Sequence, residues 1–373
     1  MDKMKIVTIM GARPQFIKAA PVSHAIAAHN RLTEVIIHTG QHFDADMSDV
    51  FFKELNIPKP GYNLGINSAS HGAMTGRMLE KIEEILIKEK PDRVLVYGDT
   101  NSTLAGALAA AKLHIPIAHV EAGLRSFNRE MPEEINRVLT DHCADILFCP
   151  TQNAVDNLQA EGIINVSSPA YQLKSSSAQE LPRIVALVGD TMYDAVLQFS
   201  EIAQRQSTIL EDLKIKPKEY LLATIHRPYN TDIPENMKSI LDAFLEIDEP
   251  IIFPVHPRTR QKLTSLPANQ LKCLILIPPV GYLDMLMLER NAKAILTDSG
   301  GMQKEAYFFG VPCVTMRTET EWVETVEAGW NVVVGAEREK IVEAVKSFKT
   351  DKPRPELYGD GRAAEKIIHQ LNC

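Results

Sequence analysis

One strand of this chain and the turn after it read RVLVYGDTNS at residues 93–102. After Arg93, residues 94–97 form a continuous apolar run rather than an alternating one, which is typical of a strand buried on both faces of a parallel sheet. A glycine and small polar residues follow, and a helical period begins at residue 102. This order of strand, polar turn and helix predicts an α/β fold.

The same order recurs in both halves of the chain. The other strands are predicted at 4–10, 34–39, 116–120 and 146–149, and then at 184–188, 220–225, 250–255, 273–277, 293–297 and 312–316. Helical patterns lie at 16–28, 72–89, 102–112, 133–144, 235–247, 282–290 and 302–309. Such alternation indicates parallel sheets that are covered by helices on both faces.

Length and composition indicate a globular protein of two domains. The chain has 373 residues, 45% hydrophobic and 24% charged, and a domain usually takes roughly 100–200 residues. The net charge of −8 argues against a general nucleic-acid or membrane-surface binder. The start, MDKMKIVTIM, turns polar too quickly for a signal peptide, and the five cysteines are dispersed without a CxxC pair. We therefore expect a cytoplasmic protein with reduced thiols and no membrane segment.

A stretch rich in serine and proline at 162–182 separates the two series of strands. We predict a Rossmann-like N-terminal domain at 1–170, a C-terminal one at 183–360, and a linker or surface insertion between them. A last helix at 361–373 is a candidate to pack back on the N-terminal domain. Two such sheets that face each other would form a cleft at the carboxyl ends of their strands, where open α/β sheets bind ligands.

The turn after the first strand reads GARPQFIK at residues 11–18. Gly11 allows a tight turn, and Pro14 suits the first turn of a helix. Arg13 and Lys18 flank the start of that helix, which itself favours anions. The pattern differs from GxGxxG, so it favours an anion site over dinucleotide binding; two solvated cations are the simpler alternative.

Three carboxylates follow strands of the first half. Asp99 ends one strand, Glu121 ends the next, and Glu133 opens the helix after it. Singly, each is explained by a helix cap or a first helical turn. Carboxylates that crowd together raise one another's proton affinity, so the set predicts acid/base chemistry.

The second half supplies candidate anion ligands. His226 with Arg227, and His256 in the sequence VHPR, follow two of its strands. A third strand runs into LTDSGGMQKE at 296–305, where Ser299, Gly300 and Gly301 open a helix whose backbone N–H groups can close on phosphate oxygens. Glu305 follows, where a carboxylate can accept two ribose hydroxyls. A plain helix-cap turn is the alternative.

We expect no metal and no cofactor. Asp44 and Asp46 resemble the Asp-x-Asp element of some metal-dependent glycosyltransferases, but they follow no predicted strand. His119 and Glu121 lack a third ligand at a recognisable spacing. A cation set of this size can neutralise a diphosphate without Mg²⁺.

Together these motifs resemble the non-hydrolysing UDP-N-acetylglucosamine 2-epimerases over essentially the full chain. The matching strings are GARP with Lys18, GQH (40–42), GDT (98–100), HVEAGLR (119–125), PEE (132–134) with NR (136–137), TDSGG (297–301) and YGDG (358–361). The resemblance implies a GT-B fold, with two Rossmann-like domains and a UDP-sugar between them. It also implies an isomerase, often a homodimer, that inverts carbon 2 of a UDP-2-acetamido sugar by anti elimination of UDP and re-addition, in bacterial surface polysaccharide precursor synthesis.

The resemblance also assigns roles to residues. It puts the catalytic groups at Asp99, Glu121, Glu133 and His226. It puts substrate contacts at Arg13, Lys18, Gln41, His42, Arg137, Arg227, His256, Ser299, Gly300, Gly301 and Glu305, with the nucleotide on the C-terminal domain.

Some positions depart from the common branch of the family. Ala12 and Gln15 replace a threonine and a glutamate, and Ser70 and His71 stand where many bacterial members bind an activating UDP-sugar. The sequence TETEWVE at 318–324 resembles a subgroup that acts on UDP-2,3-diacetamido-2,3-dideoxyglucuronate. The substrate is thus either that sugar or the UDP-GlcNAc/UDP-ManNAc pair.

Three other functions share parts of this pattern. A GT-B glycosyltransferase has the same fold and diphosphate site but needs one base and an acceptor groove. A hydrolysing 2-epimerase would release the free sugar, and a non-catalytic UDP-sugar sensor would bind without turnover.

Overall fold

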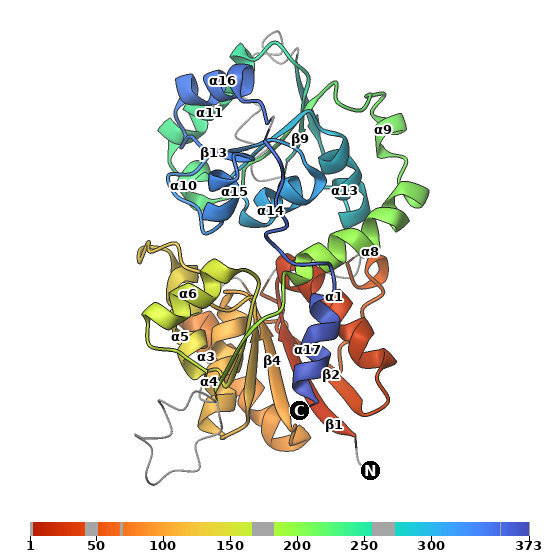
Figure 1. Cartoon of the computed structure of the whole chain (residues 1–373), viewed down its shortest axis with the longest axis vertical. Helices are drawn as coiled ribbons and strands as arrows, with labels where there is room; N and C mark the ends of the chain where they lie inside the picture. The colour runs from red at the N-terminus through yellow and green to blue at the C-terminus, as the bar shows by residue number, and fades with distance from the viewer. Residues whose placement is uncertain are drawn as a thin grey trace. The chain divides into compact units, whose positions relative to one another are not determined.

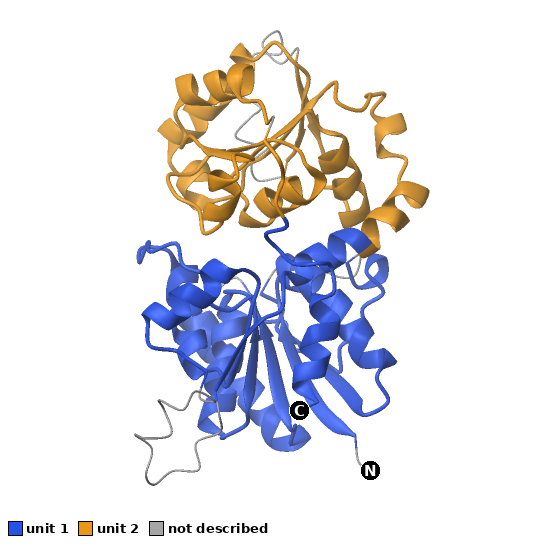
Figure 2. Cartoon of the chain, viewed as in Figure 1, with its two compact units in different colours: residues 1–197, 356–373 blue, residues 198–355 orange. Residues whose placement is uncertain are grey.

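The chain forms two compact units, which are coloured separately in Figure 2. The computed structural model describes residues 3–41, 51–67, 70–165, 183–255, 273–350 and 352–372. Unit 1 comprises 1–197 and 356–373, and unit 2 comprises 198–355. Each unit contains one parallel sheet, so the predicted α/β class with two Rossmann-like domains is confirmed.

Unit 1 is built on a seven-stranded sheet (Figure 1). Its strands, in the order β3-β2-β1-β4-β5-β6-β7, are β1 (Met4–Met10), β2 (Leu32–His38), β3 (Tyr62–Asn63), β4 (Arg93–Tyr97), β5 (Ile117–Val120), β6 (Ile146–Cys149) and β7 (Ile184–Leu187). Its helices are α1 (Arg13–Ala28), α3 (His71–Glu89), α4 (Asn101–Lys112), α5 (Pro132–Cys143), α6 (Gln152–Ala160), the first part of α8 (Thr191–Gln206) and α17 (Ala363–Leu371). Every strand pair is parallel.

Unit 2 is built on a six-stranded parallel sheet of order β10-β9-β8-β11-β12-β13. Its strands are β8 (Leu221–Thr224), β9 (Ile251–Pro254), β10 (Leu274–Ile277), β11 (Ala294–Thr297), β12 (Cys313–Thr315) and β13 (Asn331–Val333). Its helices are the rest of α8, α9 (Ile209–Asp212), α10 (Pro228–Thr231), α11 (Pro234–Glu246), α13 (Tyr282–Asn291), α14 (Gly300–Phe309), α15 (Val323–Glu327) and α16 (Arg338–Ser347).

Both sheets are buried on both faces, as the continuous apolar strands predict. Val94 to Tyr97 of β4 are fully buried. In β8, Leu221 and Ala223 belong to one apolar cluster, whereas Leu222 belongs to the cluster on the other face. Because successive side chains of a strand point to opposite faces, a sheet that is covered on both sides needs apolar residues at every position.

The boundary between the units differs from the predicted one at residue 183. Strand β7 pairs with β6, with Ile184 opposite Ile146, and so belongs to the first sheet. The chain leaves unit 1 within α8, after Leu197, and returns after Pro355. The serine-rich stretch therefore precedes the last strand of unit 1 and is not the crossing between units; its residues 166–182 lie outside the described part of the chain.

The segment that precedes α8 and the segment by which the chain returns to unit 1 pack against each other within unit 1. The Asp190 amide donates to the Tyr358 carbonyl at 3.0 Å. Gly189 has φ +94°, and a Cβ there would lie 2.9 Å from the Tyr358 oxygen, so only glycine fits without displacement. Past this contact, α17 packs on α1, where Asn372 hydrogen-bonds His29 at 3.1 Å.

Asp194 ties α8 to the start of α17. Its carboxylate accepts the amides of Ala363 at 3.1 Å and Ala364 at 2.7 Å. Burial raises the pKa of Asp194 to about 6, opposed by these two hydrogen bonds and assisted by the charges of Asp190 and Asp360. The folded protein therefore holds this proton more tightly than the unfolded chain does.

Replacing Asp194 with Asn should flatten the pH dependence of stability between pH 4 and 7. Because the pKa of Asp194 is higher in the folded protein than in the unfolded chain, its protonation stabilises the fold fully at a pH below the pKa of the unfolded chain. This contribution is lost as the pH rises through about 6. We expect the wild-type free energy of unfolding to fall by on the order of 2 kcal/mol more than that of Asp194→Asn over this range. Urea unfolding followed by circular dichroism measures it. The exposed Asp248→Asn is the control; identical slopes for Asp194→Asn and wild type would contradict the assignment.

The remaining composition-based expectations concern cysteines and membrane segments. Cys149 and Cys313 are buried free thiols on strands, as expected for small core residues, and Cys143 and Cys273 are also free. Within the described residues, no helix combines the length and the apolar character that crossing a bilayer requires.

Candidate functional site

In unit 1, two of the predicted catalytic carboxylates follow neighbouring strands. Strand β4 pairs with β5, with Tyr97 opposite Val120, and the Gly98 amide donates to the Val120 carbonyl at 2.9 Å. Asp99 follows the first of these tips and Glu121 the second. The parallel register therefore brings both to the same edge of the sheet, as predicted.

Glu121 is held in an unusual position. Its backbone has φ +71°, which is uncommon for a residue with a side chain and marks a site held by its surroundings. Its carboxylate forms a buried ion pair with Lys18 of α1. A Cβ on Gly98 would lie 3.5 Å from Glu121 Oε1 and 3.3 Å from Lys18 Nζ. The small residue at position 98 thus makes room for this pair beside Asp99.

Asp99 is fixed from α5. Arg137, which is buried, donates to Asp99 Oδ2 at 2.6 Å and to Glu134 Oε2 at 2.8 Å. Asn136 donates to the Asp99 carbonyl at 2.9 Å. Arg137 and Asn136 therefore anchor the Asp99 backbone and side chain, whereas a quarter of the Asp99 side chain is exposed.

Glu133 and Glu134 have different environments at the start of α5. Glu134 is buried and accepts the amides of Ser126 at 3.0 Å and Phe127 at 2.9 Å. Burial raises its pKa, but the Ser126 amide and Arg137 outweigh that effect and lower it, so Glu134 is an ionised structural group. Glu133, the predicted catalytic residue, is partly exposed in the same turn.

The turn after β1 is closed by Gln15, one of the departures from the family pattern. Its Oε1 accepts the amides of Gly11 at 2.8 Å and Ala12 at 3.1 Å, and its Nε2 donates to the Tyr97 carbonyl at 2.9 Å. Gln15 therefore links the tips of β1 and β4. Arg13 is partly exposed, with its guanidinium 4.8 Å from the centre of the Phe51 ring.

Gln41 also serves this edge of the sheet. Its Oε1 accepts from the Ser102 amide at 3.0 Å and from the Ser102 hydroxyl at 2.8 Å, at the start of α4. The predicted site residues Arg13, Lys18, Gln41, Asp99, Glu121, Glu133 and Arg137 thus lie on the turns after β1, β2, β4 and β5, and on α1 and α5.

In unit 2, the buried carboxylate of Asp298 organises the turn after β8. It accepts the amides of His226 at 3.0 Å and Arg227 at 3.0 Å, and the side chain of Asn230 at 3.0 Å. His226 Nδ1 lies 3.2 Å from Asp298 Oδ1, and 56% of the His226 side chain is exposed. Asp298 thus fixes the histidine on one nitrogen and leaves the other edge of the ring toward solvent.

Helix α14 begins at the predicted phosphate-binding turn. Ser299 is its N-cap and accepts the Met302 amide at 3.4 Å. A Cβ on Gly300 would lie 2.4 Å from Glu321 Oε1 and 3.3 Å from Trp322 Nε1, so any larger residue at this position would displace the Glu321 side chain. Glu305 is buried in the next turn. The helix N-terminus exists as predicted.

Two residues of this turn's neighbourhood were missing from the sequence interpretation. Lys304 is buried, with its ammonium 4.1 Å from the centre of the Trp322 ring. Arg317 forms an ion pair with Glu321, with 3.0 Å between its guanidinium and the carboxylate. The segment TETEW (318–322) therefore packs against the N-terminal part of α14. No local sequence pattern predicts this contact.

The structural residues Asp141 and His119 were also missed as a pair. Both are fully buried, and His119 Nδ1 lies 2.7 Å from Asp141 Oδ1. They lie 22 positions apart in the sequence, and their contact arises only when α5 packs on β5. The spacing of Arg137 and Asp141 by one helical turn suggests a pair between those two residues instead, but Arg137 binds Asp99 and Glu134.

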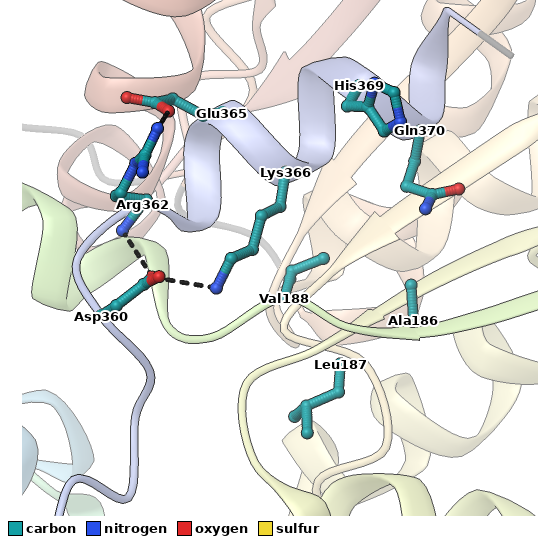
Figure 3. Close-up of a pocket in the computed structure, with 9 residues that line it drawn as sticks. All are labelled: Ala186, Leu187, Val188, Asp360, Arg362, Glu365, Lys366, His369 and Gln370. Carbon is teal, nitrogen blue, oxygen red and sulfur yellow. Dashed lines mark hydrogen bonds and ion pairs between the residues drawn. The ribbon is translucent and has the colours of Figure 1, made fainter.

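A cavity of about 480 Å³ lies between β7 and α17 (Figure 3). It is lined by Ala186, Leu187, Val188, Asp360, Arg362, Glu365, Lys366, His369 and Gln370. Its charged side chains pair with one another: Arg362 with Glu365 at 2.6 Å and Lys366 with Asp360 at 2.9 Å. None of its residues belongs to the predicted site.

Some predicted residues lie outside the described part of the chain. They are His42, Asp44, Asp46 and His256.

Comparisons with known proteins identify the family. The family model of UDP-N-acetylglucosamine 2-epimerase matches residues 24–372. The chain is 56% identical to a UDP-N-acetylglucosamine 2-epimerase homolog of Methanococcus maripaludis and 52% identical to the UDP-2,3-diacetamido-2,3-dideoxy-D-glucuronate 2-epimerase of Pseudomonas aeruginosa, each over 99% of both chains.

A solved structure of a UDP-GlcNAc 2-epimerase is also similar to this chain. The Methanocaldococcus jannaschii UDP-GlcNAc 2-epimerase, crystallised with UDP-GlcNAc and UDP, is 44% identical, with a TM-score of 0.86 over 100% of this chain and 99% of that one. The recognised resemblance and the GT-B type of fold, two Rossmann-like domains in one chain, are thus confirmed. This protein belongs to the UDP-N-acetylglucosamine 2-epimerase family and is an isomerase.

Proposed function

We propose that the protein is a non-hydrolysing 2-epimerase of a UDP-2-acetamido sugar. The observation that carries the proposal is the pair Asp99 and Glu121 at the ends of neighbouring strands, in a chain more than half identical to 2-epimerases. Two acid/base groups are what inversion at a carbon requires, because the proton leaves one face and returns to the other.

In the proposed reaction, one carboxylate takes the proton from carbon 2 while the bond between carbon 1 and the UDP oxygen breaks. The C–H electron pair forms the carbon 1–carbon 2 double bond of a 2-acetamidoglucal, and the C–O pair leaves with UDP. UDP then adds back to carbon 1, while a second acid protonates carbon 2 from the opposite face. Asp99, Glu121 and Glu133 are the proposed acid/base groups.

UDP gains negative charge as the bond breaks, and we propose that cations and helix N–H groups stabilise it. The proposed groups are Arg13, His226 and the turn of Ser299, Gly300 and Gly301. The other proposed contacts are Gln41, His42, Arg227, His256 and Glu305. Lys18 and Arg137 have carboxylate partners within the protein, which supports a role for them in holding Glu121 and Asp99.

For the substrate we favour UDP-2,3-diacetamido-2,3-dideoxyglucuronate. The Pseudomonas relative named for that sugar is 52% identical, against 45% for a relative named for UDP-N-acetylglucosamine. The TETEW segment, which resembles the subgroup that acts on that sugar, packs against the start of α14 beside the proposed phosphate-binding turn. UDP-N-acetylglucosamine is the second candidate, favoured by the solved complex of the Methanocaldococcus relative. A cytoplasmic homodimer that supplies surface polysaccharide precursors belongs to the same proposal.

Product analysis by NMR tests this proposal. Each UDP-sugar is incubated with the purified protein, and we expect the 2-epimer to form, faster with the diacetamido-glucuronate. Free sugar with an equal amount of UDP would instead indicate hydrolysis, and transfer to an added acceptor would indicate a glycosyltransferase. No conversion of either sugar would contradict the proposal.

Arg13→Ala should weaken UDP binding. Removing one charge-assisted contact costs about 1.5–3 kcal/mol, so we expect the Kd for UDP to rise about 10- to 100-fold by calorimetry. The exposed Arg31→Ala, at the far end of α1, is the control for net charge. If both variants bind UDP like the wild type, Arg13 has no part in nucleotide binding.

A further inference from the structure

We propose that His119 is a buried imidazolium, protonated on both nitrogens, that positions Asp99 and Glu121 for the reaction. The charge assignment stands on the hydrogen bonds of the ring and the charges around it, and the positioning role rests on the proposed function.

The partners of the ring define its protons. His119 Nδ1 lies 2.7 Å from Asp141 Oδ1, and Nε2 lies 2.8 Å from the Gly98 carbonyl oxygen. A backbone carbonyl only accepts, so Nε2 must donate to it. An ionised carboxylate also only accepts, so Nδ1 must donate as well. A neutral imidazole has one N–H and one lone pair, and it would place that lone pair against an oxygen.

Asp141 is ionised, so it cannot supply the proton itself. Its second oxygen accepts Arg125 at 2.7 Å and the Gly123 amide at 3.1 Å. Burial raises the pKa of Asp141, but hydrogen bonds and neighbouring charges outweigh it and lower the pKa; among them the guanidinium of Arg125 is a permanent cation and acts whatever the charge of His119. The carboxylate therefore receives donors on both oxygens, and both protons of the ring belong to His119.

The charges around the ring balance an imidazolium. Arg125 is buried and forms ion pairs with Asp141 and with Glu161, each at 2.7 Å. The cluster thus contains two anions, Asp141 and Glu161, beside His119 and Arg125. On the neighbouring strand, burial raises the pKa of the Cys149 thiol, which stays neutral. Toward the tip of β5, Glu121 faces Lys18. Two anions thus compensate the two cations of the buried cluster.

The second bond of the ring reaches the functional edge of the sheet. His119 Nε2 donates a hydrogen bond to the Gly98 carbonyl, and the Gly98 amide donates one to the Val120 carbonyl. Asp99 is the next residue after Gly98, and Glu121 the next after Val120. Gly98 and Glu121 both have positive φ, +61° and +71°, so the tips turn away sharply. The charged ring of His119 thereby fixes the backbone from which the side chains of Asp99 and Glu121 extend.

Neutron diffraction of the wild-type protein, exchanged into heavy water at a pD near 8.5, tests the charge. We expect deuterium on both ring nitrogens of His119. Deuterium on one nitrogen only would overturn the assignment. This experiment needs neither a variant nor an active enzyme, so it decides the charge even if the proposed reaction is wrong.

The variant His119→Gln tests the positioning role. We expect kcat to fall about 100-fold, as for a misplacement near 1 Å, with KM changed less than about threefold. The acid limb of the profile of kcat/KM against pH should move to higher pH, because a positive charge beside two carboxylates is lost. The control His114→Gln, at an exposed position between α4 and β5, should match the wild type.

Unchanged kcat and an unmoved pH profile in a folded His119→Gln protein would overturn the positioning role. A fall in kcat with an unmoved profile would also count against it, because general loosening of the fold lowers activity without shifting a titration. If circular dichroism shows the variant unfolded, His119→Asn takes its place, with the same expected shift because it removes the same positive charge. A wild type inactive on both UDP-sugars would refute the proposed function instead.

Discussion

Glu121→Gln should lower kcat by about three orders of magnitude, within the range that a positioned acid/base group supplies. The amide keeps the size of the side chain but cannot take a proton from carbon 2. UDP binding should change little, because the proposed nucleotide contacts lie mainly on unit 2. Epimerisation followed by NMR gives kcat, and calorimetry gives the Kd for UDP.

The control must separate chemistry from the loss of the ion pair with Lys18. Removing one partner of a buried pair destabilises a fold, so the thermal unfolding of Glu121→Gln is measured beside that of the exposed Glu130→Gln. A Glu121→Gln protein that is folded, binds UDP and turns over like the wild type would remove Glu121 from the mechanism. Equal loss of UDP binding and turnover would contradict the division of roles between Glu121 and Arg13.

Asp298→Ala should destabilise unit 2 by about 3–5 kcal/mol and abolish activity. The buried carboxylate accepts two backbone amides and the Asn230 side chain, and alanine would leave these donors without an acceptor in the interior. His226 would also lose the group that fixes Nδ1. Asp298→Asn keeps an oxygen in place and should lose less stability.

Fluorescence can follow unit 2 selectively in urea. The chain has two tryptophans, Trp322 and Trp330, and both lie in unit 2. Asn230→Ala is the matched comparison, because it removes one donor instead of the acceptor and should cost much less. Equal midpoints for Asp298→Ala and the wild type would show that the turn after β8 holds its shape without Asp298.

Much of the fold follows from short-range patterns. The strand at 93–97 is buried from Val94 to Tyr97 because these four residues are all apolar, and the small residues after it cap α4. Strands β3 and β13 were missed because each is short. The boundary was misplaced because β7 looks like any apolar strand; only its pairing with β6, across the serine-rich stretch, assigns it to unit 1.

The candidate site was predictable where residues stand at strand ends. Asp99, Glu121, His226 and Ser299 each lie within two residues of a strand end, and a parallel sheet brings such positions to one of its edges. The supporting groups were not predictable, because their contacts span the sequence: Gln15 reaches Tyr97, and Asp298 reaches His226. Such pairs exist only once the sheet order is known.

Deuterium incorporation at carbon 2 tests the central claim most directly. The protein is incubated in heavy water with UDP-2,3-diacetamido-2,3-dideoxyglucuronate and, separately, with UDP-N-acetylglucosamine, and the UDP-sugars are examined by proton NMR. We predict that the carbon-2 proton signal disappears at least as fast as the epimer forms, and that Glu121→Gln slows both together. Epimer formation with the carbon-2 proton retained, or no exchange with either sugar, would contradict proton removal by these carboxylates.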